Sequence, residues 1–308
     1  MSKKYFIILF IILFSCNKKN KKYYYSSGEL YSIVELDNDG RNHGRLKVMY
    51  KSGELKLIGN YIHGKKTGFV KSFFKTGKLK AIEKYKDGEW IDTTEIFNSL
   101  GKKKFLKYKI KNKIILNELN EQGITIAKGE VKDSLLTGWW EYYYNSSRIK
   151  KKIEYLKLEK DKQYINQTIF YNLKGEIEKD SSNYFDFDFP DTIPLNKLVI
   201  GKISLKSNIS IKDNFYMVYF NSFNNKDITI DSTYGETIKP AKLWVKFNTI
   251  GRKKIKGYIL EKNQSIVINK RDTSLVDIIN TEHKMYFEKD IHVFQNYFLP
   301  SKYQYKKP

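Results

Sequence analysis

Residues 64–79 read GKKTGFVKSFFKTGKL, and they are the most informative part of the chain. Short apolar and aromatic runs stand between Gly64, Gly68 and Gly77. Each of these glycines has counterparts at a spacing of about 24 residues along the chain. The three series are Gly28, Gly53, Gly77 and Gly101; Gly40, Gly64 and Gly88; and Gly44 and Gly68. Three glycine series that share one period predict an internal structural repeat.

The residues between the glycines follow the same period. Tyr50–Leu55 (YKSGEL) matches Phe74–Leu79 (FKTGKL), and glycines 129 and 138 have the same spacing as glycines 59 and 68. Less regular copies of the turn occur at 97–101, 119–123 and 171–175, and in this register Tyr144 aligns with Phe74. We therefore expect about six repeats over residues 25–180.

Each repeat consists of two short alternating runs separated by glycine turns, which predicts one β-hairpin per repeat. Glycine adopts the positive φ that tight turns require. Stacked hairpins then bury a continuous row of side chains, which a single hairpin cannot do. The glycines that we expect to be structural are Gly28, Gly40, Gly44, Gly53, Gly64, Gly68, Gly77, Gly88, Gly101 and Gly138.

The stretch 64–79 resembles the bacterial variant of the MORN repeat, which reads approximately G-K-x-x-G-x-(x)3-aromatic-aromatic-x-x-G-x-L, and Gly138–Tyr144 (GWWEYYY) resembles the same core. The resemblance covers about half of the chain. It implies an elongated, twisted antiparallel sheet with a scaffold or binding role, and some members of the family are antitoxin components. Ser147 replaces a repeat glycine and 102–113 has no second glycine series, which leaves the register of residues 102–128 open.

The N-terminus has the pattern of a secretory signal. Two lysines precede the apolar run Tyr5–Phe14, which is too short to span a bilayer. The residues LFSC that end at Cys16 resemble a bacterial lipobox, which implies a signal peptide at 1–15 and acyl chains on Cys16. We expect residues 16–24 to be a basic tether and the protein to be lipid-anchored in the outer membrane of a bacterial cell envelope. The alternative is an ordinary signal with an incidental cysteine.

The C-terminal part predicts a different domain. Residues 181–194 contain Pro190 and Pro194 and are expected to be a linker. Alternating Asp and Phe at 185–189 places the acidic side chains on one face of a strand. Short apolar runs over 195–308 predict a β-sandwich of immunoglobulin-like architecture. The predicted fold class is all-β.

No residue pattern indicates catalysis, and we expect neither an enzyme nor a cofactor nor a metal. H-E-x-x-H, G-x-S-x-G, Walker A and C-x-x-C motifs are absent from the sequence. His43 and His63 lie beside repeat glycines and are interpreted as turn residues, with a metal or polar-ligand role as the alternative.

The charge of the chain bears on its partners. Lys and Arg total 57 against 34 Asp and Glu, a formal charge of +23. Nucleic acid is not expected as a partner, because the chain carries an export signal and its basic residues are almost all lysine. An acidic protein or an anionic component of the envelope is the expected partner.

The alternation of side chains along a strand identifies a candidate binding surface. Trp139, Glu141 and Tyr143 are expected to point to one face and Trp140, Tyr142 and Tyr144 to the other, with Tyr144 in the core. The aromatic and basic residues that we assign to the binding face are Phe69, Phe73, Trp139, Tyr143, Lys65 and Lys66. The alternative is that other parts of the protein cover these rings.

Two functions fit the sequence. The first is a non-catalytic binding or scaffold lipoprotein that acts through its MORN-like sheet. The second, which only the family resemblance suggests, is an antitoxin or immunity protein. An exported protein of this second kind would have to neutralise a toxin that acts at the envelope.

Overall fold

The computed structural model describes residues 19–144, 148–159, 162–207, 215–220, 228–230, 233–236, 239–268 and 276–295. The expected signal peptide at 1–15, Cys16 and Ser147 lie outside the described residues. The chain divides into two compact units, of which the first ends at Thr125 and the second begins at Ile126.

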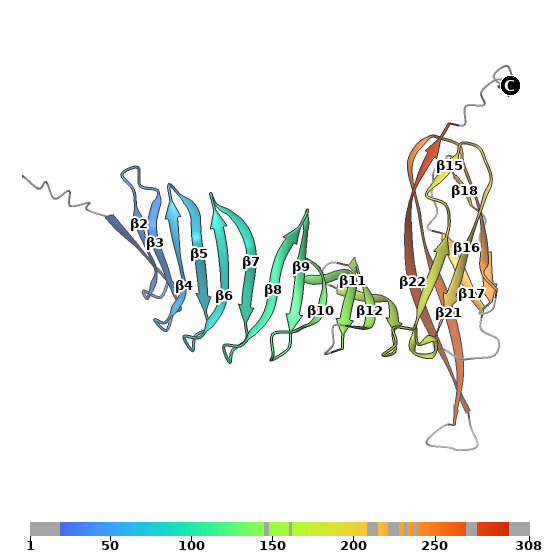
Figure 1. Ribbon diagram of the computed structural model, residues 1–308, viewed down its shortest axis with the longest axis horizontal. Coiled ribbons are helices and arrows are strands. Elements are labelled where there is room, and N and C mark those ends of the chain that lie inside the picture. Colours follow the sequence, from blue (N-terminus) through green and yellow to red (C-terminus); the bar gives the residue numbers. More distant parts are fainter. Residues whose placement is uncertain are drawn as a thin grey trace, which may run out of the picture. The chain divides into compact units, whose positions relative to one another are not determined.

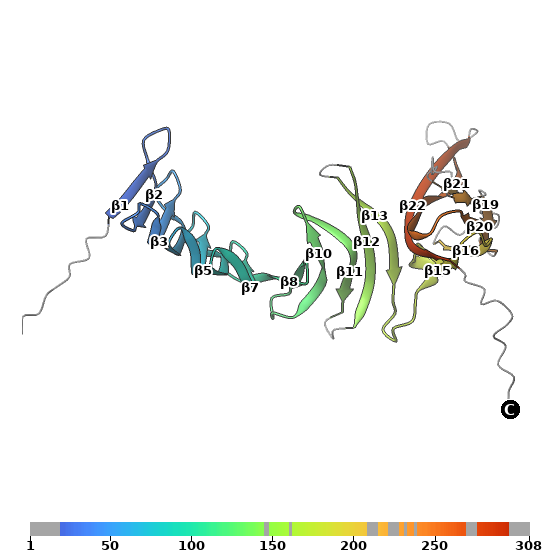
Figure 2. The same cartoon turned by 90° about the horizontal axis from the view of Figure 1, so that it is seen from above.

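The repeats form antiparallel strands that are hydrogen-bonded in chain order, β1 to β13 (Figures 1 and 2). The strands of the first unit are β1 (Lys19–Tyr24), β2 (Leu30–Leu36), β3 (Asn42–Met49), β4 (Leu55–Ile62), β5 (Lys65–Phe73), β6 (Leu79–Lys86), β7 (Glu89–Phe97), β8 (Lys103–Ile110) and β9 (Lys113–Leu119). They are followed by β10 (Thr125–Lys132), β11 (Leu135–Tyr143), β12 (Ile149–Glu159) and β13 (Lys162–Phe170). Within the described residues, strands β2 to β13 make six consecutive hairpins, and the predicted antiparallel sheet of hairpins is confirmed.

Two kinds of turn join the strands of this sheet. In the first kind, the N–H of Tyr50 donates to the carbonyl of Glu54 (2.8 Å) and the N–H of Gly53 donates to that of Tyr50 (2.9 Å). In the second kind, two residues with positive φ, such as His63 (46°) and Gly64 (80°), join the strands directly. All of the glycines that the sequence assigns to turns have positive φ.

A bulge inside the β4–β5 hairpin explains the third glycine series, Gly44 and Gly68. Ile58 pairs with Lys71 and Asn60 pairs with Thr67, so that Gly59 alone faces the three residues from Gly68 to Val70. The Val70 side chain then lies over Gly59, where an added Cβ would meet its Cγ2 at 3.0 Å. The β10–β11 hairpin has the same bulge, with Trp140 over Gly129.

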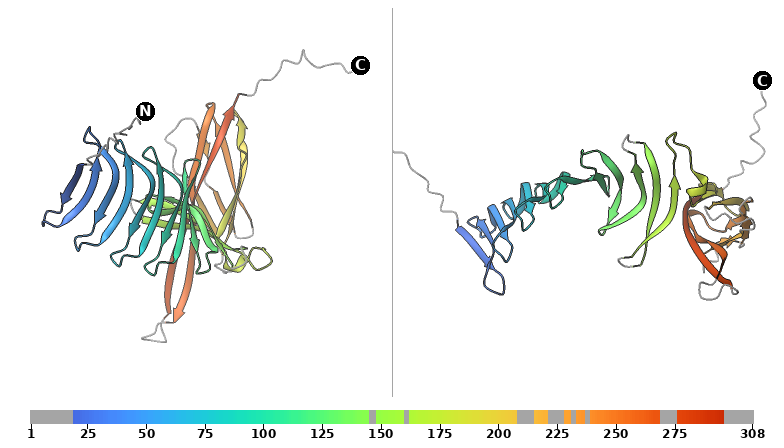
Figure 3. Two further views of the ribbon diagram at one scale, coloured as in Figure 1. Left: turned by 60° about the vertical axis from the view of Figure 1, so that its left-hand side comes forward. Right: turned by 90° about the horizontal axis from the view of Figure 1, so that it is seen from below.

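The tail is a β-sandwich. The remaining strands are β14 (Tyr184–Asp188), β15 (Thr192–Pro194), β16 (Val199–Lys206), β17 (Phe215–Phe220), β18 (Ile228–Ile230), β19 (Thr233–Glu236), β20 (Ala241–Phe247), β21 (Gly251–Ile268) and β22 (Val276–Phe294). They form two sheets, β14-β16-β20-β18 and β15-β22-β21-β17-β19, and a short 3-10 helix, Lys179–Ser181, precedes them. The long β21–β22 pair is prominent in Figure 3. Both sheets contribute to one apolar core that includes Ile203, Leu243, Val245, Ile259 and Met285.

The structure corrects three predicted boundaries. Residues 19–24, expected in the tether, form β1 and pair with β2. Residues 181–194, expected to be a linker, contain β14 and β15, because Phe189 and Ile193 are buried in the sandwich core. The compact units divide at residue 125 rather than near 181, and the Asn166 side chain of β13 is hydrogen-bonded to the backbone of Tyr286 in β22.

Candidate functional site

The aromatic residues proposed on β5 differ in exposure. Phe69 is 57% exposed, and the Nζ atom of Lys84 lies 5.7 Å from the centre of its ring. Phe69 points outward because the bulge at Gly68 turns the next residue, Val70, onto Gly59. Phe73 is half-buried. This strand therefore presents one open aromatic ring with a cation beside it.

The two lysines proposed beside this ring lie at the start of β5. Lys65 is exposed, whereas Lys66 is half-buried and its Nζ lies 4.9 Å from the centre of the Tyr85 ring. The cation that lies over the Phe69 ring is Lys84, which is not among the residues assigned to the binding face from the sequence. Its position could have been found from the hairpin register, because Phe69 and Lys84 are direct cross-strand partners.

The corresponding strand of the second unit, β11, repeats this pattern. Trp139 is 40% exposed and pairs with Glu154, whereas Trp140 is buried and donates its Nε1–H to the carbonyl of Glu130 (2.9 Å). Tyr143 is half-buried, and its hydroxyl donates to Glu141 (2.7 Å). This hydrogen bond and the ion pair with Lys152 lower the pKa of Glu141.

The structure thus places the four candidate aromatics in two equivalent pairs, one in each unit. In each pair one ring is exposed and one is half-buried. Tyr144 is half-buried rather than deeply buried, and its hydroxyl donates to the carbonyl of Tyr171 in the next repeat (3.0 Å). Tyr50 makes the same kind of bond to the carbonyl of Phe73 (2.8 Å), so these turn tyrosines connect neighbouring hairpins.

The second unit also contains a cleft that the sequence analysis missed. It has a volume of about 740 Å³ and is lined by residues of β12, β14 and β22, among them Lys157, Phe187, Tyr286 and Lys289. These residues are far apart in the chain, so no local pattern indicates the cleft. The alternation of Phe and Asp at 185–189 was its one sequence signal, because it turns the Phe rings inward and the Asp side chains to solvent.

A buried amide holds the last hairpin against the sandwich beside this cleft. Asn166 of β13 donates through Nδ2 to the carbonyl of Tyr286 (2.8 Å) and accepts from its N–H through Oδ1 (2.7 Å). Asn166 also donates to Glu154 (2.6 Å). Because the side chain is almost completely buried and fully paired, it fixes the position of β13 on β22.

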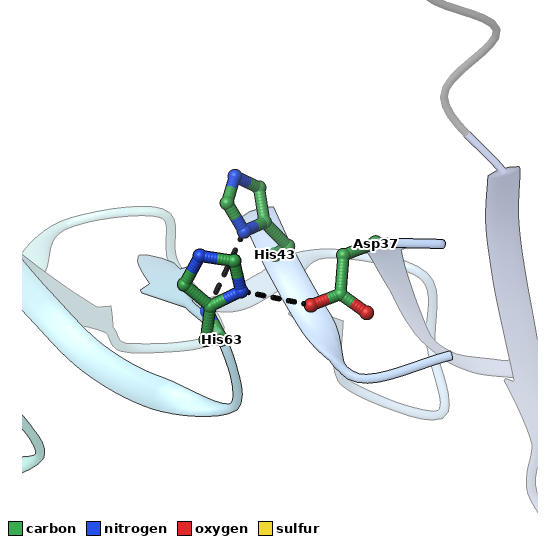
Figure 4. Close-up of side chains that lie close together, drawn as sticks. All are labelled: Asp37, His43 and His63. Carbon is green, nitrogen blue, oxygen red and sulfur yellow. Dashed lines mark hydrogen bonds and ion pairs between the residues drawn. The ribbon is translucent and has the colours of Figure 1, made fainter. Parts of the chain in front are cut away.

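A polar cluster forms at one edge of the first unit (Figure 4). It contains Asp37 from the β2–β3 turn, His43 at the start of β3 and His63 from the β4–β5 turn. Oδ2 of Asp37 lies 3.1 Å from Nδ1 of His63, and the two imidazole rings meet edge to face with their centres 4.9 Å apart. The interpretation of both histidines as turn residues holds for the backbone of His63, but it did not foresee that the rings meet.

Among the described residues, no helix is long and apolar enough to cross a membrane. No protein-family model matches this sequence. No curated protein matches it either.

Proposed function

We propose that the protein is a non-catalytic binding lipoprotein of the bacterial cell envelope, anchored through Cys16, whose MORN-like sheet contacts an acidic partner. The signal and lipobox of the sequence support the location. The exposure of Phe69 beside Lys84 is the observation that carries the binding role.

Physical chemistry favours such a surface for binding. An exposed aromatic ring loses apolar contact with water when a partner covers it, and rings of this kind dominate the energetics of protein interfaces. The adjacent lysine attracts carboxylates and orients an approaching acidic partner. Trp139 provides an equivalent exposed ring in the second unit.

The test is a capture experiment with the full-length chain, solubilised in detergent, on envelope extract. Phe69→Ala and Trp139→Ala remove one exposed ring each, and the partner retained by the wild-type chain should be recovered several-fold less with either variant. Recovery should also fall with added salt, because salt screens the attraction between lysines and carboxylates. A captured envelope-acting toxin would identify the binding role as an immunity function.

Ile200→Ala serves as the matched control, since it removes an exposed apolar side chain from the sandwich instead of the repeats. Its recovery of the partner should equal that of the wild-type chain. The proposal is wrong if both aromatic variants retain the partner as well as Ile200→Ala does. A large loss of thermal stability in Phe69→Ala would also contradict it, because the ring would then be structural.

A further inference from the structure

The tips of two neighbouring hairpins bring three potential metal ligands together in the first unit. Asp37, His43 and His63 each offer one ligand atom, and these atoms all lie within 4.8 Å of one another (Figure 4). The 24-residue period produces this meeting, because it stacks the turn that ends at Gly40 beside the turn that contains Gly64.

The Asp37 carboxylate is held in a fixed orientation. Its Oδ1 accepts hydrogen bonds from the backbone N–H groups of Asp39 (3.1 Å) and Arg41 (2.8 Å), while Oδ2 faces His63. These bonds orient the carboxylate with Oδ2 toward His63, and the side chain is only 12% exposed.

Arg41 shows that the cluster already attracts a cation. Its Nε–H donates to Oδ2 of Asp37 (3.0 Å), and its Nη2 lies 3.1 Å from Nδ1 of His63. The same Nδ1 of His63 lies 3.1 Å from Oδ2 of Asp37. The carboxylate and the imidazole nitrogen therefore both lie beside one positive charge.

The guanidinium is a replaceable occupant. Arg41 is half-exposed, and its Nη2 also contacts Oδ2 of Asp39 (2.6 Å), so the side chain has a second anionic partner outside the cluster. His43 completes the donor set. Its Nδ1 accepts a long hydrogen bond from the N–H of His63 (3.4 Å), and one of its ring nitrogens lies within 4.8 Å of the ligand atoms of Asp37 and His63.

We propose that Asp37, His43 and His63 bind one divalent transition-metal ion of the Zn²⁺ type, in competition with Arg41. Two imidazoles and one carboxylate are a common donor set for Zn²⁺, whereas Mg²⁺ and Ca²⁺ prefer oxygen ligands alone. The 3.1 Å between Oδ2 and Nδ1 is close to the ligand separation of about 3.3 Å that bonds of about 2.0 Å give in a tetrahedral site. Water fills the remaining position.

The test is calorimetric titration of ZnCl₂ into the full-length chain in detergent after treatment with a chelator. We expect one Zn²⁺ per chain and no response to MgCl₂. Removing an outer-shell partner of a metal ligand costs about 10–100-fold in affinity, so losing a ligand itself, in His63→Asn or His43→Gln, should weaken binding by at least about tenfold. Asn suits position 63 because it tolerates positive φ.

The Arg41→Ala variant distinguishes a cluster that binds metal from a cluster that only stabilises the turn. The variant loses an ion pair of the turn, yet it should bind Zn²⁺ several-fold more tightly because the competing cation is gone. His292→Gln, an exposed histidine of β22, is the control and should bind like the wild-type chain. Zinc should raise the melting midpoint of the wild-type chain but not that of His63→Asn.

Two results would overturn the proposal. The first is equal Zn²⁺ affinity, or equal lack of uptake, in the wild-type chain and His63→Asn. The second is unchanged or weaker binding in Arg41→Ala, which would show that the guanidinium and the metal do not compete for one position.

Discussion

The repeat sheet and the sandwich are both made of antiparallel strands, but they bury their side chains in different ways. In the first unit, Val34, Val70 and Leu119 are among the few deeply buried apolar side chains of the described residues. In the sandwich, two sheets enclose a core in which residues such as Leu243 and Ile259 are completely buried. The comparison teaches that one β-rich chain can be stabilised by neighbour-to-neighbour contacts in one region and by a closed core in another.

This difference predicts that truncating a buried apolar side chain lowers the free energy of unfolding most in the sandwich. Leu243→Ala empties a fully buried position of the sandwich and should lower the free energy of unfolding by about 2–5 kcal/mol. The measurement is denaturant unfolding followed by tryptophan fluorescence, to which Trp244 contributes. Ile200→Ala on the neighbouring strand β16 removes a side chain that is 55% exposed and should change stability by less than about 0.5 kcal/mol. Equal effects of the two substitutions would show that the sandwich core is not closed.

A smaller effect is expected where the repeat sheet depends on glycine for packing. In Gly129→Ala the new Cβ would lie 2.4 Å from the Trp140 ring, so the indole must move and its bond to Glu130 is strained. We expect a loss of about 1–3 kcal/mol, together with a shift in tryptophan emission. Trp140→Val should cost less stability in the Gly129→Ala background than in the wild-type chain, because there it also removes the clash with the added Cβ. An equal cost in both backgrounds would contradict the packing that we describe.

The smallest changes in stability should come from turns, where a substitution strains the backbone conformation rather than the packing. Gly64→Val places a β-branched residue at a φ of 80° and should cost about 1–2 kcal/mol. Gly68→Val tests the same strain at the bulge, where φ is 69°. In the turn of hairpin β8–β9, Lys111 aligns with His63 and has a φ of 53°, so Lys111→Gly should instead stabilise the chain by up to about 1 kcal/mol. The melting midpoint should fall in the two valine variants and rise in Lys111→Gly. A lower melting midpoint in Lys111→Gly would refute the strain argument.

Hairpin β8–β9 also shows how far the repeat pattern could be followed. Residues 102–113 have no second glycine series, and the register there was left open. The structure pairs β8 and β9 without a bulge, from Phe105 with Glu118 to Ile110 with Lys113. The hairpins that contain the bulge have Gly44, Gly68, Asp92 or Gly138 at positive φ in their second strand. No residue of β9 has positive φ, so the regular ladder continues there.

The sequence by itself determined the all-β class, the 24-residue period, the six hairpins and the positions of the turns. These features are local, because they depend on side-chain alternation and on glycines at positive φ. The inward turn of Trp140 also followed from alternation alone. The exposure of Phe69 depends on the bulge as well as on alternation. The sequence shows the spacing of Gly59 and Gly68 as part of the repeat, but that spacing does not show that a bulge lies between them.

Only the tertiary structure decided which distant segments pack against and hydrogen-bond to one another. Residues 181–194 look like a linker because of their prolines, yet Phe189 and Ile193 belong to the sandwich core. The cleft of the second unit and the Asn166–Tyr286 bonds join residues whose separations carry no local signal. The 24-residue period stacks the turns of Asp37 and His63, but it does not show that their side chains and His43 meet. The physical reason is that a side chain's direction follows from its own strand, whereas its neighbours depend on how strands and sheets pack.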